Sequence, residues 1–586
     1  MKKNKINFIS FIFTVSTLSV AVGEIFDCKI HPSNFKPGQF IEININNTLR
    51  NNQGLFIRIK TNNVYFTEQE ITNVIDNIYT TKFLVPEFCT SIDLAFRDRD
   101  QIFFKKNNKI QKWSFMTTTP EPIKISDTKN DRINPSSVMM QGFYWDCPEE
   151  WYHTMQKAAH HLRYIYKGYG IDRIWFPPPQ KSDFGVNSMG YDPYDYYDLG
   201  TYNQKGTVST RFGTNKQLQR TIKTYQTLGI KCMADLVLNH RVGGHLEKHK
   251  NDKSKMTNTN FENVKSKKCL WNYNEFYPLM NQFNDLGRFN DYPDISHLNA
   301  SMKGTAGYDL IQWANWLKLP RNAGFDGGWR FDYVKGINAS YIHTFRKKTD
   351  NSFGILECWD SLENIEKYSR FSGYTHAFDF PLFYAMSSVF NDKHSIKALI
   401  DPNINLATKN PNIAVTFVAN HDTDKDHHVP SIRNNIMLAY AFILTYQGYP
   451  CVFWHDYFNK KLYNFGGQDG NGIAPLIWIR GNLGGKNMRT HVLDSSDAHL
   501  AYESTNKASD HAGFISLINN SNYEKKVNLV SKNEHFFSKN LISYAWYSYD
   551  IDHNKKITDL YCDNTGKFSC TIPPNGYLVL SKEGLE

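Results

Sequence analysis

Hydrophobic residues recur with two different periods along this chain, and the change of period divides it into regions. Between residues 24 and 125, apolar and polar residues alternate with a period of two, as on a strand with one buried face. The alternation is clearest in residues 40–45, 55–60, 91–97 and 112–115. We therefore expect an N-terminal β-sandwich over residues 24–125, followed by a linker rich in proline and polar residues.

From residue 136 onward, short apolar runs alternate with longer stretches of helical spacing. The eight apolar runs span residues 138–145, 171–177, 230–238, 327–334, 353–359, 376–380, 413–420 and 449–454. Helical spacing is clearest in residues 213–228, 309–319 and 432–445. Eight such units predict an α/β fold, a (β/α)8 TIM barrel, formed by residues 131–240 and 306–485.

Two further regions interrupt and follow the predicted barrel. Roughly 70 residues rich in Lys, Asn, Asp and Gly separate the third run from the next helical stretch, and irregular excursions of this length are usually functional. We interpret residues 241–305 as an inserted subdomain. After the barrel, short alternating runs at residues 515–517, 543–546 and 576–580 predict a C-terminal β-sandwich over residues 486–586.

Length, charge and the first residues narrow the class of protein. A chain of 586 residues has room for several domains, because a single core rarely grows past roughly 250–300 residues. The charge of +10 is spread along the chain without a basic block interleaved with aromatics, so no nucleic-acid partner is expected. Residues 1–23 have the basic start, short apolar run and small final residues of a secretory signal peptide. A membrane anchor is the alternative, but polar residues interrupt the run and it is short for a span. We expect a secreted protein, extracellular or periplasmic, with no membrane segment after cleavage.

The nine cysteines are an odd number, so at least one thiol stays unpaired. In an exported protein Cys28 would be able to pair with Cys89, and Cys562 with Cys570, which flank a predicted hairpin. The other five lack Cys-x-x-Cys spacing, and we expect buried thiols rather than metal ligands at Cys147, Cys232, Cys269, Cys358 and Cys451.

Charged residues follow the predicted strands. Arg330 and Asp332 stand two residues apart, so on a strand they share one face. A carboxylate beside a fixed cation has a lowered pKa and stays ionised, which suits a nucleophile. Glu357 ends an apolar run, where a raised pKa suits a general acid. The alternatives are a structural ion pair and a solvent-exposed strand cap.

Two other strand ends carry polar residues. Asn239 and His240 end the third strand, and His421 and Asp422 end the seventh. An amide oxygen suits Ca²⁺, and a histidine suits a sugar hydroxyl, although a simple loop cap is the alternative for Asn239 and His240. Two carboxylates about 5 Å apart would make a retaining glycosidase.

These strand ends also carry a family resemblance. Residues 235–240, 328–336, 357 and 417–422 resemble the four signature segments of the α-amylase family, glycoside hydrolase family 13. The segments at 140–146, 188–196, 205–213 and 441–446 resemble its archaeal and plant branch, and the resemblance spans residues 136–480.

The resemblance implies an α-amylase that cleaves internal α-1,4-glucosidic bonds of starch, glycogen and maltooligosaccharides with retention, and acts as a monomer. An α-glucan transferase of the same family, or a non-catalytic carbohydrate-binding protein on this fold, stays open. For residues 24–125, a starch-binding module and a structural domain both stay open.

Site roles are also implied by the resemblance. Asp332 would be the nucleophile, Glu357 the general acid and base, and Asp422 the third carboxylate. The implied substrate-binding residues are Tyr191, His240, Arg330, Lys335 and His421.

A calcium ion is implied as well, because residues 285–294 resemble the family's calcium loop. The implied ligands are Asn239, Asp285 and Asp294 through their side chains and Gly287 and Gly336 through backbone carbonyls. Some archaeal relatives hold zinc nearby, but the matching positions carry Tyr277, Gln282 and Ser296, so we expect no zinc. We expect the adjacent His297 to lie on the surface.

Overall fold

A computed structural model of the chain describes two stretches. It describes the strands between residues 27 and 116, and residues 134–585 except 249–255, 277–293, 298–299, 351, 425–430, 468–470, 486–487 and 506–510. The predicted signal peptide and most of the predicted linker lie outside the described residues. So do the side chains of Cys28 and Cys89, the predicted ligands Asp285 and Gly287, and the positions Tyr277 and Gln282.

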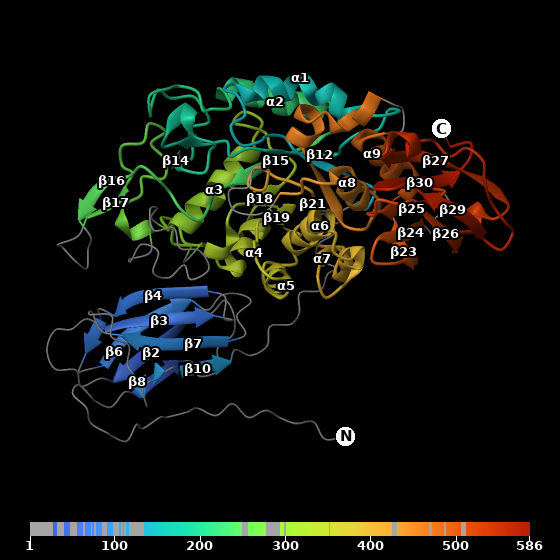
Figure 1. Cartoon of the computed structure of the whole chain (residues 1–586). Helices are drawn as coiled ribbons and strands as arrows, with labels where there is room; N and C mark the ends of the chain where they lie inside the picture. The colour runs from blue at the N-terminus through green and yellow to red at the C-terminus, as the bar shows by residue number, and fades with distance from the viewer. Residues whose placement is uncertain are drawn as a thin grey trace.

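The N-terminal strands form two four-stranded sheets (Figure 1). One sheet has the order β1 (Asp27–His31), β2 (Phe40–Asn46), β6 (Ile78–Leu84) and β5 (Asn73–Ile75). The other has the order β10 (Trp113–Met116), β7 (Ser91–Arg97), β3 (Leu55–Thr61) and β4 (Tyr65–Ile71). The four alternating segments seen in the sequence are therefore strands, and Ile43 and Leu94, one from each sheet, are fully buried.

Eight parallel strands close into a barrel, which confirms the predicted fold class. Each predicted run holds one strand, and their order around the barrel follows the chain. The strands are β11 (Met139–Gln141), β12 (Arg173–Phe176), β15 (Lys231–Leu236), β18 (Trp329–Phe331), β19 (Gly354–Leu356), β20 (His376–Phe378), β21 (Ala414–Phe417) and β22 (Tyr449–Phe453). They are shorter than the apolar runs, and the remaining residues of each run turn into the loops that carry the polar side chains.

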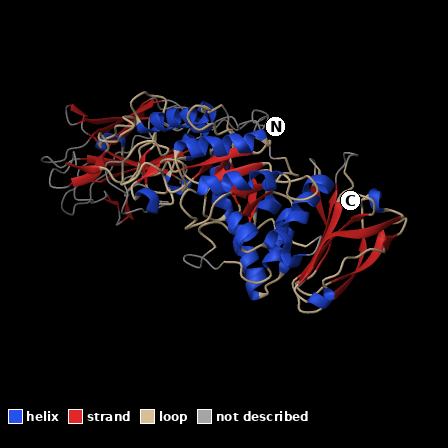
Figure 2. Cartoon of the chain, turned by 90° about the horizontal axis from the view of Figure 1, so that it is seen from above, coloured by secondary structure: helices blue, strands red, loops and turns tan. Residues whose placement is uncertain are grey.

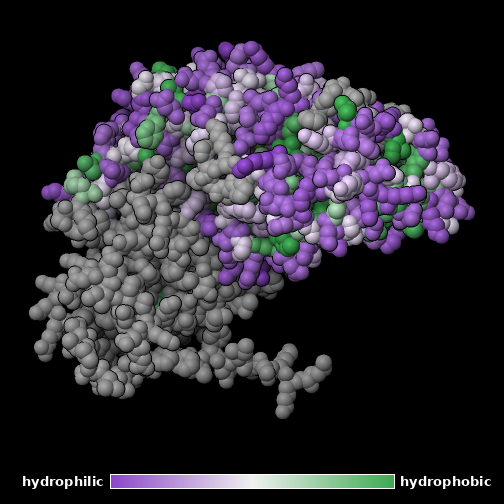
Figure 3. Space-filling view, viewed as in Figure 1, coloured by the Kyte–Doolittle hydropathy of each residue, from purple (hydrophilic) through white to green (hydrophobic). Residues whose placement is uncertain are grey.

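Helices cover the outside of the barrel (Figure 2). They are α1 (Trp151–Arg163), α2 (Asn215–Thr227), α3 (Ala306–Lys318), α4 (Ala339–Lys348), α5 (Leu362–Phe371), α6 (Phe380–Asp392), α7 (Leu406–Lys409), α8 (Ile436–Thr445) and α9 (Ile473–Ile479). Among the described residues, no helix has the length and apolar content needed to cross a membrane. On the face shown in Figure 3, the described surface is mostly hydrophilic and its hydrophobic side chains are scattered.

The C-terminal strands form a six-stranded sheet that packs against the barrel through α8. Its order is β23 (Arg489–Ser495), β24 (His499–Thr505), β25 (Phe514–Asn519), β30 (Gly576–Lys582), β27 (Lys539–Ser548) and β28 (Leu560–Cys562). A second, two-stranded sheet pairs β26 (Lys525–Val530) with β29 (Lys567–Ile572). Residues 437–445 of α8 are all buried, because the helix lies between the barrel and this domain.

The suggested Cys562–Cys570 disulfide is wrong in the structure. Cys562 lies on β28, which pairs with β27, whereas Cys570 lies on β29, which pairs with β26. A tight turn at residues 563–566 joins the two strands, which then extend different sheets, and both thiols are free and buried. The five cysteines expected to be buried thiols are buried and free, as predicted.

The described part of the insertion is anchored to the third barrel strand. It contains β16 (His245–Lys248), β17 (Met256–Asn260) and the short helix η3 (Tyr273–Glu275). Its far end returns to the barrel, where the amide of Ile295 donates to the carbonyl of Asn239 at 2.9 Å and His240 forms a β-bridge with Asp294.

Candidate active site

One buried arginine holds three carboxylates at the carboxyl ends of neighbouring barrel strands. Arg330, on β18, places its guanidinium Nη1 2.6 Å from Asp332 Oδ1 and 3.0 Å from Asp235 Oδ1. Its Nη2 lies 2.7 Å from Glu357 Oε1. The predicted contact between Arg330 and Asp332 is therefore present, and the planar fork of the guanidinium reaches two further acids.

The backbone after β18 also serves this cluster. Tyr333 has a φ of 43°, in the left-handed region that residues with a side chain seldom adopt. In this turn its amide N–H donates to Glu357 Oε2 at 2.7 Å. Glu357 therefore has one oxygen on Arg330 and the other on a backbone amide, which fixes the orientation of its carboxyl group.

Burial raises the pKa of all three carboxyls, and the guanidinium opposes the rise in each. The pKa of Asp235 is about 6, that of Asp332 about 7 and that of Glu357 about 8. The expected lowered pKa of Asp332 is thus wrong, because removal of the carboxylate from water outweighs the attraction of Arg330. The raised pKa of Glu357 is as predicted, with burial as the main cause.

Strand β21 brings a fourth carboxylate and a histidine to the same end of the barrel. His421 Nε2 lies 3.4 Å from Asp422 Oδ2, and Gln141 from β11 lies 2.8 Å from His421 Nδ1. Burial lowers the pKa of His421 to about 4, so the ring is uncharged at neutral pH. The imidazole can therefore act as a neutral hydrogen-bonding group.

Aromatic rings pack beside this histidine. The ring of Tyr191 stacks on His421 with 5.2 Å between centroids and 7° between planes. Trp145 lies parallel to both rings at 6.1 Å and is 39% exposed. The Tyr191 hydroxyl donates to Asp235 Oδ2 at 2.9 Å. Flat rings of this kind offer a surface for the apolar face of a sugar.

Two other predicted substrate-binding residues border the cluster. His240 is buried, and its Nε2 lies 2.8 Å from the backbone carbonyl oxygen of Tyr191. Burial lowers its pKa to about 4, so this ring is also neutral. Lys335 Nζ donates to the carbonyl of Trp359 at 3.0 Å and lies 3.2 Å from Asp360 Oδ2, close to Glu357 in sequence.

Part of the predicted metal site is also brought together. Asn239 and Asp294 are both buried, and Asn239 Nδ2 lies 3.4 Å from Asp294 Oδ1. Gly336 lies in the short helix η4 (Val334–Gly336), after Tyr333, whose pKa is raised by burial first and then by the charge of Asp294. Of the described predicted ligands, Asn239 and Asp294 therefore lie together where the insertion meets the barrel.

His297 is not a surface residue, contrary to expectation. It is 5% exposed, its Nε2 lies 2.8 Å from the carbonyl oxygen of Leu238, and its ring packs on Tyr341 at 4.5 Å. The sequence pattern missed this because the neighbouring Ile295 is held against the barrel and draws the next residues inward.

The comparisons with known proteins agree with this geometry. The family model for the α-amylase catalytic domain matches residues 122–459, more than half of the chain. The chain belongs to the α-amylase family. It is therefore a glycoside hydrolase.

Related enzymes of this family match more than half of the chain. The glucan 1,4-α-maltohexaosidase of Bacillus sp. (strain 707) is 30% identical over 395 residues, which are 58% of this chain and 75% of that protein. The α-amylase of Bacillus licheniformis is 29% identical over 378 residues, 56% of this chain and 72% of that one. Among solved structures, the α-amylase from Geobacillus thermoleovorans complexed with acarbose has a TM-score of 0.54 and 17% identity, and covers 78% of this chain and 100% of its own.

Four residues of this amylase-family site were not among the predicted site residues. Asp235 was visible only as part of a signature segment, but the register of β15 on β18 places it directly beside Arg330. Trp175, from β12, donates to Asp235 Oδ2 at 3.1 Å. Gln141 and Trp145 stand in a segment that marked the first strand. A polar side chain inside a buried strand, as at Asp235 and Gln141, was the signal available.

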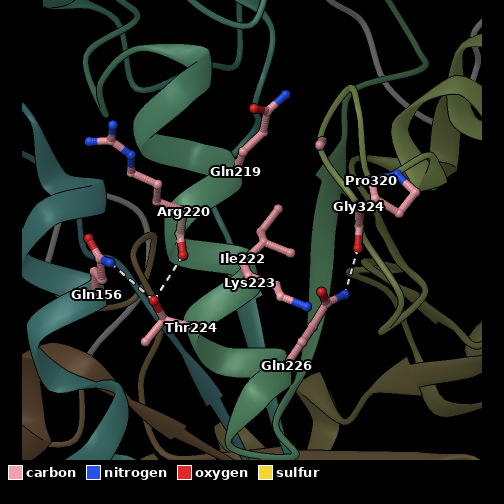
Figure 4. Close-up of a pocket in the computed structure, with 10 residues that line it drawn as sticks. Gln156, Gln219, Arg220, Ile222, Lys223, Thr224, Gln226, Pro320 and Gly324 are labelled. Carbon is pink, nitrogen blue, oxygen red and sulfur yellow. Dashed lines mark hydrogen bonds between the residues drawn. The ribbon is translucent and has the colours of Figure 1, made fainter.

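A hollow of about 450 Å³ lies elsewhere, outside the barrel between α2 and the segment after α3 (Figure 4). It is lined by residues such as Gln219, Arg220, Lys223 and Gly324, and none of its lining residues carries a carboxylate. The hollow therefore offers no carboxyl group for acid–base catalysis, whereas the cluster around Arg330 brings three carboxyl groups together.

Proposed function

We propose that the chain is a secreted, endo-acting α-amylase that hydrolyses internal α-1,4-glucosidic bonds of starch, glycogen and maltooligosaccharides with retention. The observation that carries the proposal is the shared guanidinium of Arg330, which contacts both Asp332 and Glu357. Two carboxyl groups on adjacent nitrogens of one guanidinium favour the short separation of roughly 5–5.5 Å that retaining enzymes use.

The surroundings of the two carboxyls support the division of roles. Burial, followed by the nearby charges of Asp332 and Asp422, raises the pKa of Glu357, which suits a proton donor, while the 2.6 Å contact with Arg330 favours the ionised form of Asp332. In the first step the Asp332 carboxylate attacks the anomeric carbon, while Glu357 gives its proton to the leaving glycosidic oxygen. In the second step ionised Glu357 takes a proton from water, the water oxygen bonds to the anomeric carbon, and Asp332 is released.

The other predicted residues would bind the sugar that reacts. Tyr191 offers its ring to the sugar face, and His240, His421 and Asp422 offer hydrogen-bonding groups to hydroxyls. Arg330 orients Asp332 and limits the rise of its pKa. Lys335 would reach a sugar on the leaving-group side.

The donors present also fit calcium. Asn239 and Asp294 supply hard oxygen atoms in a buried place between the insertion and the barrel, and Gly336 would add a carbonyl. Asp285 and Gly287 would complete the set. When bound, the ion would supply no catalytic group but would hold the insertion beside the active site.

Release of reducing ends from soluble starch tests the proposal. We compare the wild type with Asp332→Asn and Glu357→Gln, and with Asp326→Asn as a matched control, because Asp326 accepts the amide of Cys232 at the other end of the barrel. We expect Asp332→Asn to abolish activity, Glu357→Gln to lower it by about a hundredfold or more, and the control to keep it. NMR of the first product should show the α-anomer.

Several outcomes would contradict the proposal. Activity that survives in Asp332→Asn excludes the assigned nucleophile, and a β-anomeric product excludes retention. Glucan chains that lengthen without new reducing ends identify a transferase, and a wild type without activity identifies a binding protein. We also propose that the protein belongs to the archaeal and plant branch of the family, that it is a monomer, and that residues 1–23 are its signal peptide.

A further inference from the structure

A second charged cluster lies two residues beyond Asp422. The side chain of Asp424 is 9% exposed and lies between two cationic or potentially cationic groups. His455 Nδ1 is 2.8 Å from Asp424 Oδ2, and Lys460 Nζ is 2.7 Å from Asp424 Oδ1. Both partners come from the segment after β22, so the cluster joins the loops that follow the seventh and eighth barrel strands.

Lys460 connects this cluster to the protein interior. Its Nζ also lies 2.8 Å from Oδ1 of Asp456, which is fully buried. Oδ2 of Asp456 accepts the hydroxyl of Tyr440, on α8, at 2.5 Å. Residues 455–459 form a π-helix, a form that occurs in short pieces and often at functional sites. Lys460 therefore links Asp424, after β21, to Asp456, a buried carboxylate of the π-helix after β22.

Asp422 lies in a tight turn between Asn420 and Asp424. Asn420 Oδ1 accepts the amides of Asp422 at 2.8 Å and Thr423 at 3.0 Å. The amide of Asp424 donates to the carbonyl of Asn420 at 3.0 Å. Asp422 therefore lies in a turn that Asn420 closes, between strand β21 and Asp424.

We propose that Asp424, Lys460 and Asp456 are positioning residues that orient Asp422 toward the substrate by fixing the turn of residues 420–424 to the π-helix after β22. The inference rests on the proposed role of Asp422. Lys460 would act through geometry, so its loss should lower kcat by about ten- to a hundredfold, the cost of a misplacement of roughly 1 Å.

A double-mutant cycle with a chromogenic maltooligosaccharide tests this inference. We compare Lys460→Met in the wild type and in Asp422→Ala. We expect Lys460→Met to lower kcat by about tenfold or more in the wild type. In Asp422→Ala it should lower kcat by less than about twofold, because there is no longer a carboxylate to orient. Lys460→Arg, which can bridge both carboxylates, should recover most of the activity.

Controls separate positioning from damage to the fold. Lys393→Met removes another partly buried lysine, which binds Asn520 and Asn575 of the C-terminal domain, and should leave activity unchanged. Asp424→Asn, which keeps an oxygen for Lys460, gives a second variant if Lys460→Met does not fold. An equal loss in both backgrounds, or no loss in the wild type, overturns the positioning role. Full activity of Asp422→Ala would instead overturn the proposed role of Asp422.

Discussion

The charge and the shape of Arg330 make separate contributions to this site, and two substitutions distinguish them. Arg330→Gln removes the charge but keeps hydrogen-bond donors. Arg330→Lys keeps a charge but replaces the planar fork by a compact ammonium that cannot hold Asp332, Asp235 and Glu357 in the same geometry.

The size of the effect follows from the electrostatics. A nearby opposite charge lowers a carboxyl pKa by roughly 1–3 units, so Arg330→Gln should raise the pKa of Asp332 from about 7 by that amount. The nucleophile must be ionised, so the acid limb of the pH profile of kcat/KM should move to higher pH. At pH values below that limb, kcat/KM of Arg330→Gln should be about 10- to 1,000-fold lower than that of the wild type. Arg330→Lys should leave the limb within about one unit and lower the maximum instead.

The assay is the pH dependence of kcat/KM for a short chromogenic maltooligosaccharide, with thermal unfolding measured in parallel. Arg241→Lys is the matched control, because Arg241 is fully buried but binds the backbone carbonyls of Tyr194 and Cys269. It should lose stability without a shift of either limb. An acid limb of Arg330→Gln that stays in place or moves to lower pH would refute the reasoning.

Three further predictions concern the acid, the metal and the cysteines. Glu357→Gln should unfold at a higher temperature than the wild type at pH 9, since raised carboxyl pKa values in the folded protein make stability fall as pH rises from about 4 to about 8; an equal or lower unfolding temperature would contradict this. A calcium chelator should lower the unfolding temperature of the wild type but have little further effect on Asp294→Ala, and equal effects on both would place the ion elsewhere. A reductant should leave the unfolding temperature unchanged, and a thiol reagent should modify Cys562 and Cys570 only after unfolding; a lower unfolding temperature in reductant would indicate a disulfide.

The barrel was predictable from the sequence because buried parallel strands are continuous apolar runs. Each run ends where the strand passes into a loop with polar side chains, so the strand ends were visible as well. The predicted contact of Arg330 with Asp332 needed only the strand period. A polar residue inside a buried strand marked Asp235 as unusual, but its contact with Arg330 was not predictable, because it depends on the register of two strands whose contacting residues are 95 positions apart. The prediction that the pKa of Asp332 is lowered was wrong for a related reason. The burial that raises this pKa depends on all the elements packed around the strand, which the local sequence does not show.

The arrangement of the two cationic clusters fits the proposed role of Asp422 in substrate binding. Arg330 holds Asp235, Asp332 and Glu357, and their side chains are at most 10% exposed. Lys460 holds Asp424 and the buried Asp456. Asp422 stands between these clusters, contacts a neutral imidazole, and is 28% exposed. Its backbone is fixed, while its carboxylate is the most accessible of this group. Such a carboxylate can accept a hydrogen bond from a sugar hydroxyl without first breaking an ion pair with a lysine or arginine. Because the charge is already in place, little reorganisation is needed in the transition state.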